Sequence, residues 1–512
     1  MKAAEHARLT TVVVVAAAFA FLGVGLSSQA TRGPEGLIND PRDLTKELAN
    51  KTKGIYTVTA VGDVLMQEPM SKKMSPELLE VLRGSDTTVG NMEVYLVDRR
   101  NWTAGFGNNW SPKEMAQDYA AMGFDMLVSG EGAGGEAGMR SSMRYLDEVG
   151  IGLAGYGANA GIARTPVLQH TSKGTIALHA AYPVTGNADW AGPGPESYGL
   201  NPFRLTRVNV VTAPQLEQLR AIRDSVAKTR NEPVNDPPNR VTVMGTPYMA
   251  GPKTGEWHYD VNPDDRRAAI LAVRNAKEYA DFSMFSMHVH QNRYAFQAYS
   301  QDHYPAQYLI DLARELVDNG MDMYVGHGNH TMQGVEIYKG RPIYYNLGNF
   351  SVHRMGLDDS GTAGPMTDIE SGEQGNLWLQ QAINQSAYVA RHTYQDGVLQ
   401  DIRLYPVDLG GAPGPDRRPW SWTDVPMTPK PARAREILAQ IQEYSKPFGT
   451  AITIEVDKLG RPVGVIKVPR ESIVPVGQQL RSSFGQPAGR GRGRGGEEPP
   501  AGAGRGGRGG GQ

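Results

Sequence analysis

Four short, strand-like runs in this chain each lead into a polar residue of a type that binds metal ions in proteins. Each run has the length and the glycine or polar boundary expected of a buried strand. The runs, with the residues that follow them, are Val58–Gly62 before Asp63, Thr87–Gly90 before Asn91, Met92 and Glu93, Phe282–Met287 before His288, Val289 and His290, and Met323–Val325 before Gly326–His330. This recurrence restricts the fold more than any single motif, because it places several donor side chains at the ends of strands.

Strand ends of this kind predict both a fold class and a type of site. In open α/β sheets, reactive groups gather beyond the carboxyl ends of the strands. A divalent ion needs donors from distant parts of the chain on a rigid scaffold, and a mixture of Asp, Asn, Glu and His resembles the donor set of a metal-dependent hydrolase. The segment GHGNH at 326–330 adds two histidines among glycines that allow the backbone to turn sharply. We therefore predict an α/β fold with a metal site.

Helical segments are predicted between the strands, and this alternation indicates layers of helices and sheets. The helix expected at 136–149 has Met139, Met143 and Leu146 at helical spacing. Further helices are expected at 76–83, 112–122, 214–229, 263–280 and 432–444, and further strands at 124–129, 175–181 and 205–211. The segment 186–261 is rich in Gly, Pro and Asn apart from a central strand and helix, and it is either an insertion bordering the site or a set of ordinary surface loops.

Five motifs in a fixed order carry a family resemblance. They are Gly62-Asp63, Asn91-Met92-Glu93, His288, Gly326-His327 with His330, and Tyr345-Asn346-Leu347-Gly348-Asn349-Phe350. In this order they resemble the poly-γ-glutamate capsule-synthesis (CapA-like) family, which belongs to the calcineurin-like metallophosphoesterase superfamily. The resemblance extends over Tyr56–Val474, and its most specific part is the block from 326 to 350. It implies a metallophosphatase-like layered sandwich of mixed β-sheets flanked by helices, formed by residues 54–480.

The chain departs from the family pattern at two places where site residues are expected. Family members usually carry Asn-Asn-His and then Asp-x-Gly after the third strand, where this chain has SGEGAGGEAG at 129–138. The family histidine falls near Ala133, so it is missing. The family's His-Trp-Gly-x-Glu-Tyr becomes HVHQNRY, so its Glu is replaced by Asn292. Glu131 and His290 are the candidates to take over as ligands.

The resemblance and the strand ends together give a set of site residues. The predicted metal ligands are Asp63, Glu93, His288, His290, His327 and His330, around one or two divalent ions of Mn, Fe or Zn. Catalytic roles are predicted for His330, for Asn91 in orienting substrate, and for Glu131 as a base. Each has a structural alternative: a strand-end histidine is often satisfied by hydrogen bonds, Asn91 can cap a loop, and the Glu131 carboxylate can simply be solvated. Asn349 is expected to be a structural residue beneath the site.

Composition and the N-terminus limit where the protein acts. The chain has no cysteine and a net charge of -2, so thiolate ligands are absent and there is no general attraction to nucleic acid. Lys2 and Arg8 precede an apolar run from Leu9 to Leu26, and Ser28-Gln29-Ala30 offers small residues where a signal peptidase cleaves. Residues 1–30 therefore predict a cleaved export signal, with an uncleaved membrane anchor as the alternative.

Two flanking segments are predicted to lie outside the folded domain. Residues 31–53 are polar and form a linker. Residues 481–512 contain Arg-Gly repeats, cannot bury a core, and are predicted to be disordered.

Three functions fit the sequence. The first is an exported, periplasmic or extracellular, metal-dependent hydrolase or transferase. It would act on a phosphoester or γ-glutamyl bond in poly-γ-glutamate or another envelope polymer, alongside envelope-synthesis machinery. The second is a non-catalytic accessory protein that binds an anionic polymer, because the departures at Ala133 and Asn292 remove site residues. The third is a metallophosphoesterase without a capsule role. No specific nucleic acid is expected as a partner, and no membrane span is expected if the signal is cleaved.

Overall fold

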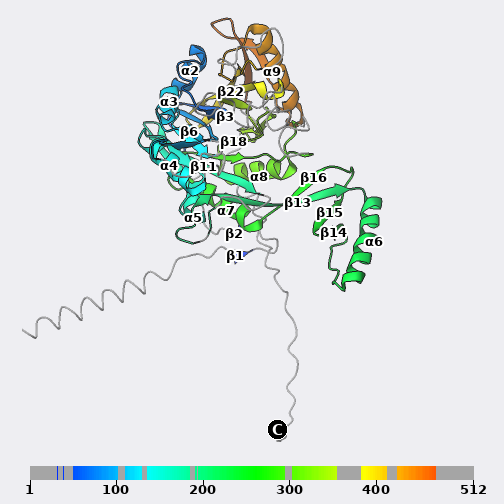
Figure 1. Ribbon diagram of the computed structural model, residues 1–512. Helices are drawn as coiled ribbons and strands as arrows, with labels where there is room; N and C mark the ends of the chain where they lie inside the picture. The colour runs from blue at the N-terminus through cyan, green and yellow to red at the C-terminus, as the bar shows by residue number, and fades with distance from the viewer. Residues whose placement is uncertain are drawn as a thin grey trace, which may run out of the picture.

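The computed structural model describes residues 31–32, 38–39, 50–101, 110–129, 135–184, 191–192, 194–294, 303–353, 382–411 and 424–468 (Figure 1). The predicted export signal at 1–30, the tail at 481–512 and Glu131 lie outside these described residues. Within the predicted linker, β1 (Thr31–Arg32) pairs with β2 (Ile38–Asn39). Among the helices of the described residues, none has the length and apolar character needed to cross a membrane.

Two mixed β-sheets form the centre of the molecule. The first sheet, within the described residues, has the order β24-β25-β23-β22-β3-β4-β7-β8, with β21 also paired to β3. Its strands are β3 (Ile55–Met66), β4 (Thr87–Met92), β7 (Met126–Ser129), β8 (Gly152–Ala154), β21 (Asn349–His353), β22 (Ser386–Gln395), β23 (Val398–Asp408), β24 (Thr453–Val456) and β25 (Pro462–Lys467). The central strands β3, β4 and β7 are parallel, whereas β22 joins β3 antiparallel.

The second sheet has the order β14-β15-β13-β11-β17-β18-β20-β19, with β10 paired to β11 and β16 to β13. Its strands are β10 (Val167–Thr171), β11 (Gly174–Val184), β13 (Pro202–Val211), β14 (Arg240–Val243), β15 (Thr246–Ala250), β16 (Trp257–Val261), β17 (Phe282–His288), β18 (Met323–His327), β19 (Val335–Tyr338) and β20 (Arg341–Tyr344). Its centre, β11-β17-β18-β20, is parallel. Two smaller pairs are β5 (Tyr95–Val97) with β6 (Trp110–Pro112), and β9 (Tyr156–Gly157) with β12 (Gly199–Leu200).

Helices cover the outer faces of both sheets. The helices of the described residues are α2 (Pro76–Arg83), α3 (Met115–Met122), α4 (Gly135–Asp147), α5 (Ala160–Ala163), α6 (Ala213–Arg230), α7 (Pro263–Ala276), α8 (Gln307–Asp318) and α9 (Pro431–Ser445). Apolar side chains of α2, α3 and α4 pack on the first sheet, and those of α7 and α8 pack on the second sheet. Between the sheets lies a further core that contains Val58, Met284 and Val325 and is closed at one edge by α9. The predicted sandwich of mixed sheets flanked by helices is therefore confirmed.

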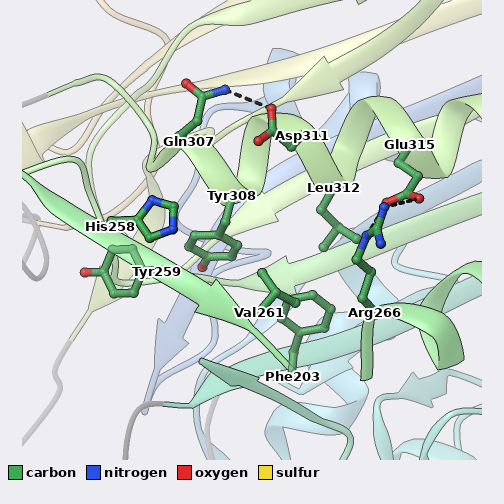
Figure 2. A pocket seen from close by; sticks show the side chains of 10 residues that line it. All are labelled: Phe203, His258, Tyr259, Val261, Arg266, Gln307, Tyr308, Asp311, Leu312 and Glu315. Carbon is green, nitrogen blue, oxygen red and sulfur yellow. Dashed lines mark hydrogen bonds and ion pairs between the residues drawn. The ribbon is translucent and has the colours of Figure 1, made fainter. Parts of the chain in front are cut away.

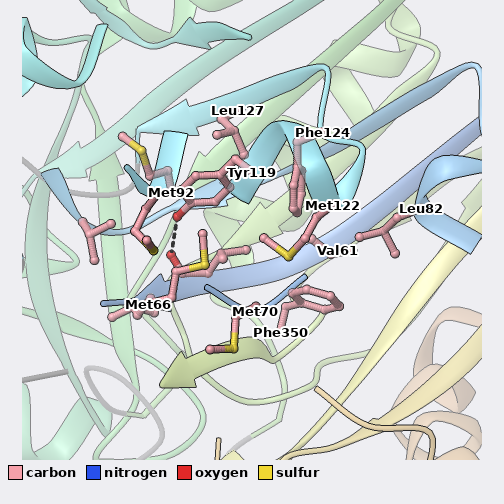
Figure 3. Close-up of a cluster of buried hydrophobic side chains, with 14 of the residues drawn as sticks. Val61, Met66, Met70, Leu82, Met92, Tyr119, Met122, Phe124, Leu127 and Phe350 are labelled. Atoms are coloured by element: carbon pink, nitrogen blue, oxygen red, sulfur yellow. Dashed lines mark hydrogen bonds between the residues drawn. The ribbon is translucent and has the colours of Figure 1, made fainter. Parts of the chain in front are cut away.

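The outer core of the first sheet is rich in methionine and aromatic side chains (Figure 3). Met66, Met92 and Phe350 come from strands, and they pack against Tyr119 and Met122 of α3. The Tyr119 hydroxyl donates to the carbonyl oxygen of Val64 at 3.2 Å. A buried polar group costs free energy unless it is hydrogen-bonded, so this bond allows Tyr119 to fill the core.

All four predicted strand ends fall short of the observed ends, and the difference is largest in β3. The strand predicted at Val58–Gly62 continues through Asp63 to Met66. The reason is a change of partner: β3 pairs with β22 up to Ala60, and with β21 from Asp63 onward. Asp63 is thus held inside the sheet by β21, a strand that lies almost three hundred positions later in the sequence.

The segment at 186–261 contains more regular structure than surface loops would. Strands β13, β14, β15 and β16 extend the second sheet, and α6 packs on them through a small core of Val211, Leu216 and Val241. Figure 1 shows α6, β14 and β15 reaching to one side of the main body. The N-terminus of α6 is closed by a capping box between Thr212 and Gln215.

Candidate metal centre

The candidate metal centre lies where strands of the two sheets meet. In the second sheet, β17 and β18 run parallel and place His288 beside His327 in register. In the first sheet, β3 and β4 run parallel and place Asp63 beside Asn91. Parallel strands bring their carboxyl ends to one edge of a sheet, so these residues gather from positions far apart in sequence. All of them are buried, with at most 2% of each side chain exposed.

Asp63 is fixed by the backbone that follows β18. Its two carboxylate oxygens accept hydrogen bonds from the amide of Gly328, at 3.0 and 3.1 Å. Gly328 has a φ of +91°, and a Cβ there would lie 2.7 Å from Cδ2 of His288. Gly62 is equally restricted, because a Cβ would lie 1.7 Å from the carbonyl oxygen of Gly348. A side chain at either glycine would therefore collide with its neighbours, at Gly328 with His288 and at Gly62 with the backbone that leads into β21.

Glu93 is the residue on which the histidines converge. Its Oε1 lies 3.4 Å from Nε2 of His288 and 3.3 Å from Nε2 of His330. Two groups of three side chains have ligand atoms within 4.8 Å of one another: Glu93 with His288 and His290, and Asp63 with Glu93 and His330. Glu93 belongs to both groups, so a single carboxylate connects two sets of donors.

Asn91 and Asn349 orient the donors. The Asn91 amide nitrogen donates to Oδ1 of Asp63 at 2.8 Å and lies 3.0 Å from Nδ1 of His288. Asn349 accepts a hydrogen bond from Nδ1 of His330 at 2.8 Å, which leaves Nε2 of His330 facing Glu93. The prediction that Asn349 lies beneath the site agrees with this contact. The carbonyl oxygen of the Asn91 side chain is buried and has no hydrogen-bond partner within the described part of the chain.

The histidines of the centre differ in charge because their neighbours differ. Burial lowers the pKa of His288 well below its usual value, and the neighbouring His290, His330 and His327 lower it further. Burial, followed by His330, lowers the pKa of His290 to about 3. Burial also acts to lower the pKa of His330, but the Glu93 and Asp63 carboxylates outweigh it and raise this pKa to about 9. Neutral imidazoles, as at His288 and His290, are the form that binds metal ions.

His290 and His327 occupy different places relative to the two donor groups. Nε2 of His290 lies 2.7 Å from Nε2 of His288, so both point at the same space. Nε2 of His327 instead donates to the carbonyl oxygen of Val61 at 3.0 Å, and Nδ1 lies 2.9 Å from the hydroxyl of Ser286. His327 thus connects β18 to β3 and lies outside both groups. Its predicted role as a ligand stays a prediction.

One side chain that borders the centre, Tyr182, was not singled out by the sequence pattern. Tyr182 of β11 stacks on His288 with ring centroids 5.4 Å apart. Asn292, where the family has Glu, donates to the Oδ1 of Asn329 at 2.9 Å and accepts from Gln333 at 2.7 Å. The only sequence signal for Tyr182 is its position one residue beyond the predicted strand 175–181.

The donor set fits a divalent transition metal. Imidazole nitrogens and carboxylate oxygens together suit Mn, Fe or Zn, and the chain has no cysteine to favour a softer ion. Ring nitrogens of His288 and His290 facing each other at 2.7 Å, and the unpaired buried oxygen of Asn91, are features that a bound cation would satisfy. The other predicted site residue, Glu131, lies outside the described residues.

The layered fold and this donor set together define a metallophosphatase-like protein. The family model described as bacterial capsule synthesis protein PGA_cap matches residues 57–353. The chain therefore belongs to the bacterial capsule synthesis protein family, which lies within the metallophosphoesterase-like superfamily.

Several known proteins are similar to this chain over different lengths. The uncharacterized protein y4sH of Sinorhizobium fredii is 34% identical over 454 residues, which cover 82% of this chain and 95% of that protein. The PGA biosynthesis protein CapA of Bacillus subtilis is 36% identical over 90 residues, which cover 18% of this chain and 22% of that protein. A solved structure of a putative 5′-nucleotidase from Staphylococcus aureus is 10% identical with a TM-score of 0.32, and covers 69% of this chain and 54% of that chain.

Proposed function

We propose that this protein is a metal-dependent hydrolase or transferase that acts in the synthesis of an envelope polymer such as poly-γ-glutamate. The observation that carries the proposal is the sharing of Glu93 by two sets of buried donors. A carboxylate among converging imidazoles supplies the mixed oxygen and nitrogen donors that suit a divalent transition metal. The family and the names of relatives such as CapA support the connection with capsule polymers.

Five side chains would hold the metal: Asp63, Glu93, His288, His290 and His330. When bound, a divalent ion lowers the pKa of a water molecule and polarises an oxygen of a phosphoester or a γ-glutamyl carbonyl. His290 would take the place of the histidine that is missing at Ala133, because its Nε2 already lies beside that of His288.

The other residues of the centre hold these donors in position. Asn349 accepts the Nδ1 proton of His330, which fixes the tautomer with Nε2 toward Glu93. Asn91 holds the Asp63 carboxylate through its amide nitrogen, and its unpaired oxygen is placed to orient a substrate donor group. Gly328 provides the backbone amide that keeps Asp63 in place.

One observation favours a second candidate, a non-catalytic accessory protein that binds an anionic polymer. Asn292 replaces a family carboxylate, and its neutral amide is engaged by Asn329 and Gln333. A centre without this charge can retain a cation and bind a polyanion without turning it over. A metallophosphoesterase with no capsule role is the third candidate, and it differs from the first in its substrate.

We also propose that the protein is exported, to the periplasm or the cell exterior. The basic residues Lys2 and Arg8, the apolar run to Leu26 and the small residues before Thr31 support this location. N-terminal sequencing of the protein from its native host should begin near Thr31. A full-length cytosolic product with Met1 in place would contradict the proposal.

The function is tested by metal analysis combined with a substrate screen. Protein purified without chelator is analysed by inductively coupled plasma mass spectrometry, and then assayed on phosphoesters and on γ-glutamyl oligomers. The proposal predicts bound transition metal and a turnover that is lost with chelator and restored by the metal. Bound metal with oligomer binding but no turnover would favour the accessory protein. His170→Ala is the matched control, since His170 is exposed and lies away from the centre.

A further inference from the structure

A second cavity lies on the outer side of the second sheet, apart from the metal centre. It has a volume of about 360 Å³ and is bounded by β13, β16, α7 and α8 (Figure 2). The residues that line it are Phe203, His258, Tyr259, Val261, Arg266, Gln307, Tyr308, Asp311, Leu312 and Glu315. None of these is a predicted ligand of the metal centre, although the Tyr308 hydroxyl donates to Gln291, the residue after His290, at 3.5 Å.

The floor of the cavity is formed by aromatic rings in contact. Phe203 of β13 stacks on Tyr308 of α8 with ring centroids 6.4 Å apart. Tyr259 of β16 meets Tyr308 edge to face at 5.4 Å. Phe203 is 1% exposed, Tyr259 5% and Tyr308 7%, so the close-packed floor offers a ligand only a small apolar area.

The rim of the cavity carries both hydrogen-bond donors and hydrogen-bond acceptors. Gln307, Asp311 and Glu315 are four residues apart along α8, so they line one face of the helix. The Gln307 amide donates to Oδ1 of Asp311 at 2.8 Å. Arg266 donates to both oxygens of Glu315, through Nε at 2.7 Å and Nη2 at 2.6 Å. His258 adds a further ring nitrogen at the opposite side, with 41% of its side chain exposed.

The charges of the rim decide which ligand fits. The Arg266 guanidinium neutralises Glu315 and repels a cation, whereas the Asp311 carboxylate repels an anion. Each carboxylate oxygen has two lone pairs, and the guanidinium has five N–H groups, so these hydrogen bonds leave both donors and acceptors for a ligand. A neutral polyhydroxyl molecule uses both kinds of partner at once, and its C–H face can lie on the aromatic floor.

We propose that this cavity binds a neutral saccharide unit. The volume is within the range of small-molecule sites and admits one sugar ring. The ring would lie against the wall formed by Phe203, Tyr259 and Tyr308, and its hydroxyls would bond to Asp311, Gln307 and the Arg266–Glu315 pair. This inference does not depend on the function proposed for the metal centre.

The test uses the full-length protein and defined sugars. Glucose, N-acetylglucosamine and their β-linked trimers are titrated, with binding followed by saturation-transfer NMR and calorimetry. At least one sugar should bind saturably, and Asp311→Ala and Gln307→Ala should each weaken its binding by about tenfold, because each removes hydrogen bonds to the ligand. Asp311→Asn keeps the shape of the side chain and should give a smaller loss. Glu443→Ala is the matched control, because Glu443 is exposed on α9 and pairs with Lys446.

Three results would overturn the proposal. One is the absence of binding by every sugar in the set. Another is sugar binding that is unchanged in both Asp311→Ala and Gln307→Ala, or sugar binding that is lost in Glu93→Gln. Either result would show that the sugar binds outside this cavity. The last is saturable binding of putrescine or glutamate at this cavity in the absence of sugar binding, which would identify a charged ligand.

Discussion

Histidines are buried in two regions of this protein, and the two regions use them differently. In the strands of the two sheets away from the metal centre, His179 and His392 are fully buried, and burial lowers the pKa of each to about 4. At the candidate metal centre, burial likewise lowers the pKa of His288 and His290, but Glu93 and Asp63 outweigh it at His330 and raise its pKa to about 9. Burial alone therefore does not distinguish the candidate ligands from the core histidines. The distinguishing feature is a carboxylate shared by converging ring nitrogens.

The hydrogen bonds of the two regions support the same distinction. His392 is satisfied within the core, because Nδ1 donates to the carbonyl oxygen of Val58 at 2.9 Å and Nε2 lies 2.6 Å from the Tyr344 hydroxyl. His179 stacks on Phe285 at 6.0 Å. His288 and His290 instead turn their Nε2 atoms toward each other. Four experiments can break or sharpen this comparison.

The largest effect is expected from Glu93→Gln. This change removes the charge that both donor groups share, so bound metal should fall by at least about tenfold. Metal content per chain is measured by mass spectrometry after gel filtration. His392→Gln is the contrasting variant, which should alter stability and leave metal content unchanged. Equal metal content in Glu93→Gln and the wild type would show that Glu93 is not the shared donor.

His290→Ala should have a smaller effect on metal binding. His290 belongs to one of the two donor groups, so its loss should remove one class of bound ion and leave the Asp63, Glu93 and His330 group occupied. Titration of metal-free protein should then show fewer sites or one weakened site. Loss of all metal would mean that the two groups bind a single ion together. Unchanged metal binding would show that His290 is not a ligand.

The core histidines should make stability depend on pH in a defined direction. The pKa of His392 is about 4 when folded and near 6.5 when unfolded, so its contribution is complete above pH 6.5 and is lost as the pH falls toward 4. Between pH 7 and pH 5, the free energy of unfolding of the metal-free protein should fall by about 2 kcal/mol through this residue. Urea denaturation of wild type and His392→Gln at both pH values measures it. Identical pH profiles in the two proteins would contradict the assignment.

The smallest effect is expected from Ser286→Ala. The variant removes the hydroxyl that lies 2.9 Å from Nδ1 of His327, and should lower the free energy of unfolding by about 1 kcal/mol. Metal content should stay near that of the wild type if His327 connects strands. A loss of metal similar to that in His290→Ala would instead give His327 the role of a ligand.

Much of the layered architecture could be predicted from local sequence patterns. The bounds of α2 at Pro76–Arg83 agree with the prediction, because Pro76, the buried Leu78 and Leu82 and the following Gly84 define a helix locally. The observed ends of β17 at His288 and of β18 at His327 lie within two residues of the predicted ends, because they too depend on short-range pattern. Such features need no knowledge of distant residues.

The parts that could not be predicted depend on contacts between distant segments. Asp63 lies inside β3 because β21 extends the pairing, and no local pattern near Asp63 reveals that strand. The sharing of Glu93 needs distances between the two sheets, which the order of motifs does not contain. Similarly, the hydrogen bond from His327 to the carbonyl oxygen of Val61 joins positions 266 residues apart.

The position of the centre between two sheets has a mechanical consequence. Asn91 and His288 are 197 positions apart, and their sheets are also joined by apolar packing and by hydrogen bonds such as that from His327 to Val61. An ion held by both Glu93 and His288 would act as a reversible cross-link between the two sheets. It would close the loop of chain between these two residues. Its departure would have to precede separation of the sheets, so the loaded protein should unfold more slowly as well as at higher denaturant. The lifetime of the folded protein would then depend on the concentration of available metal.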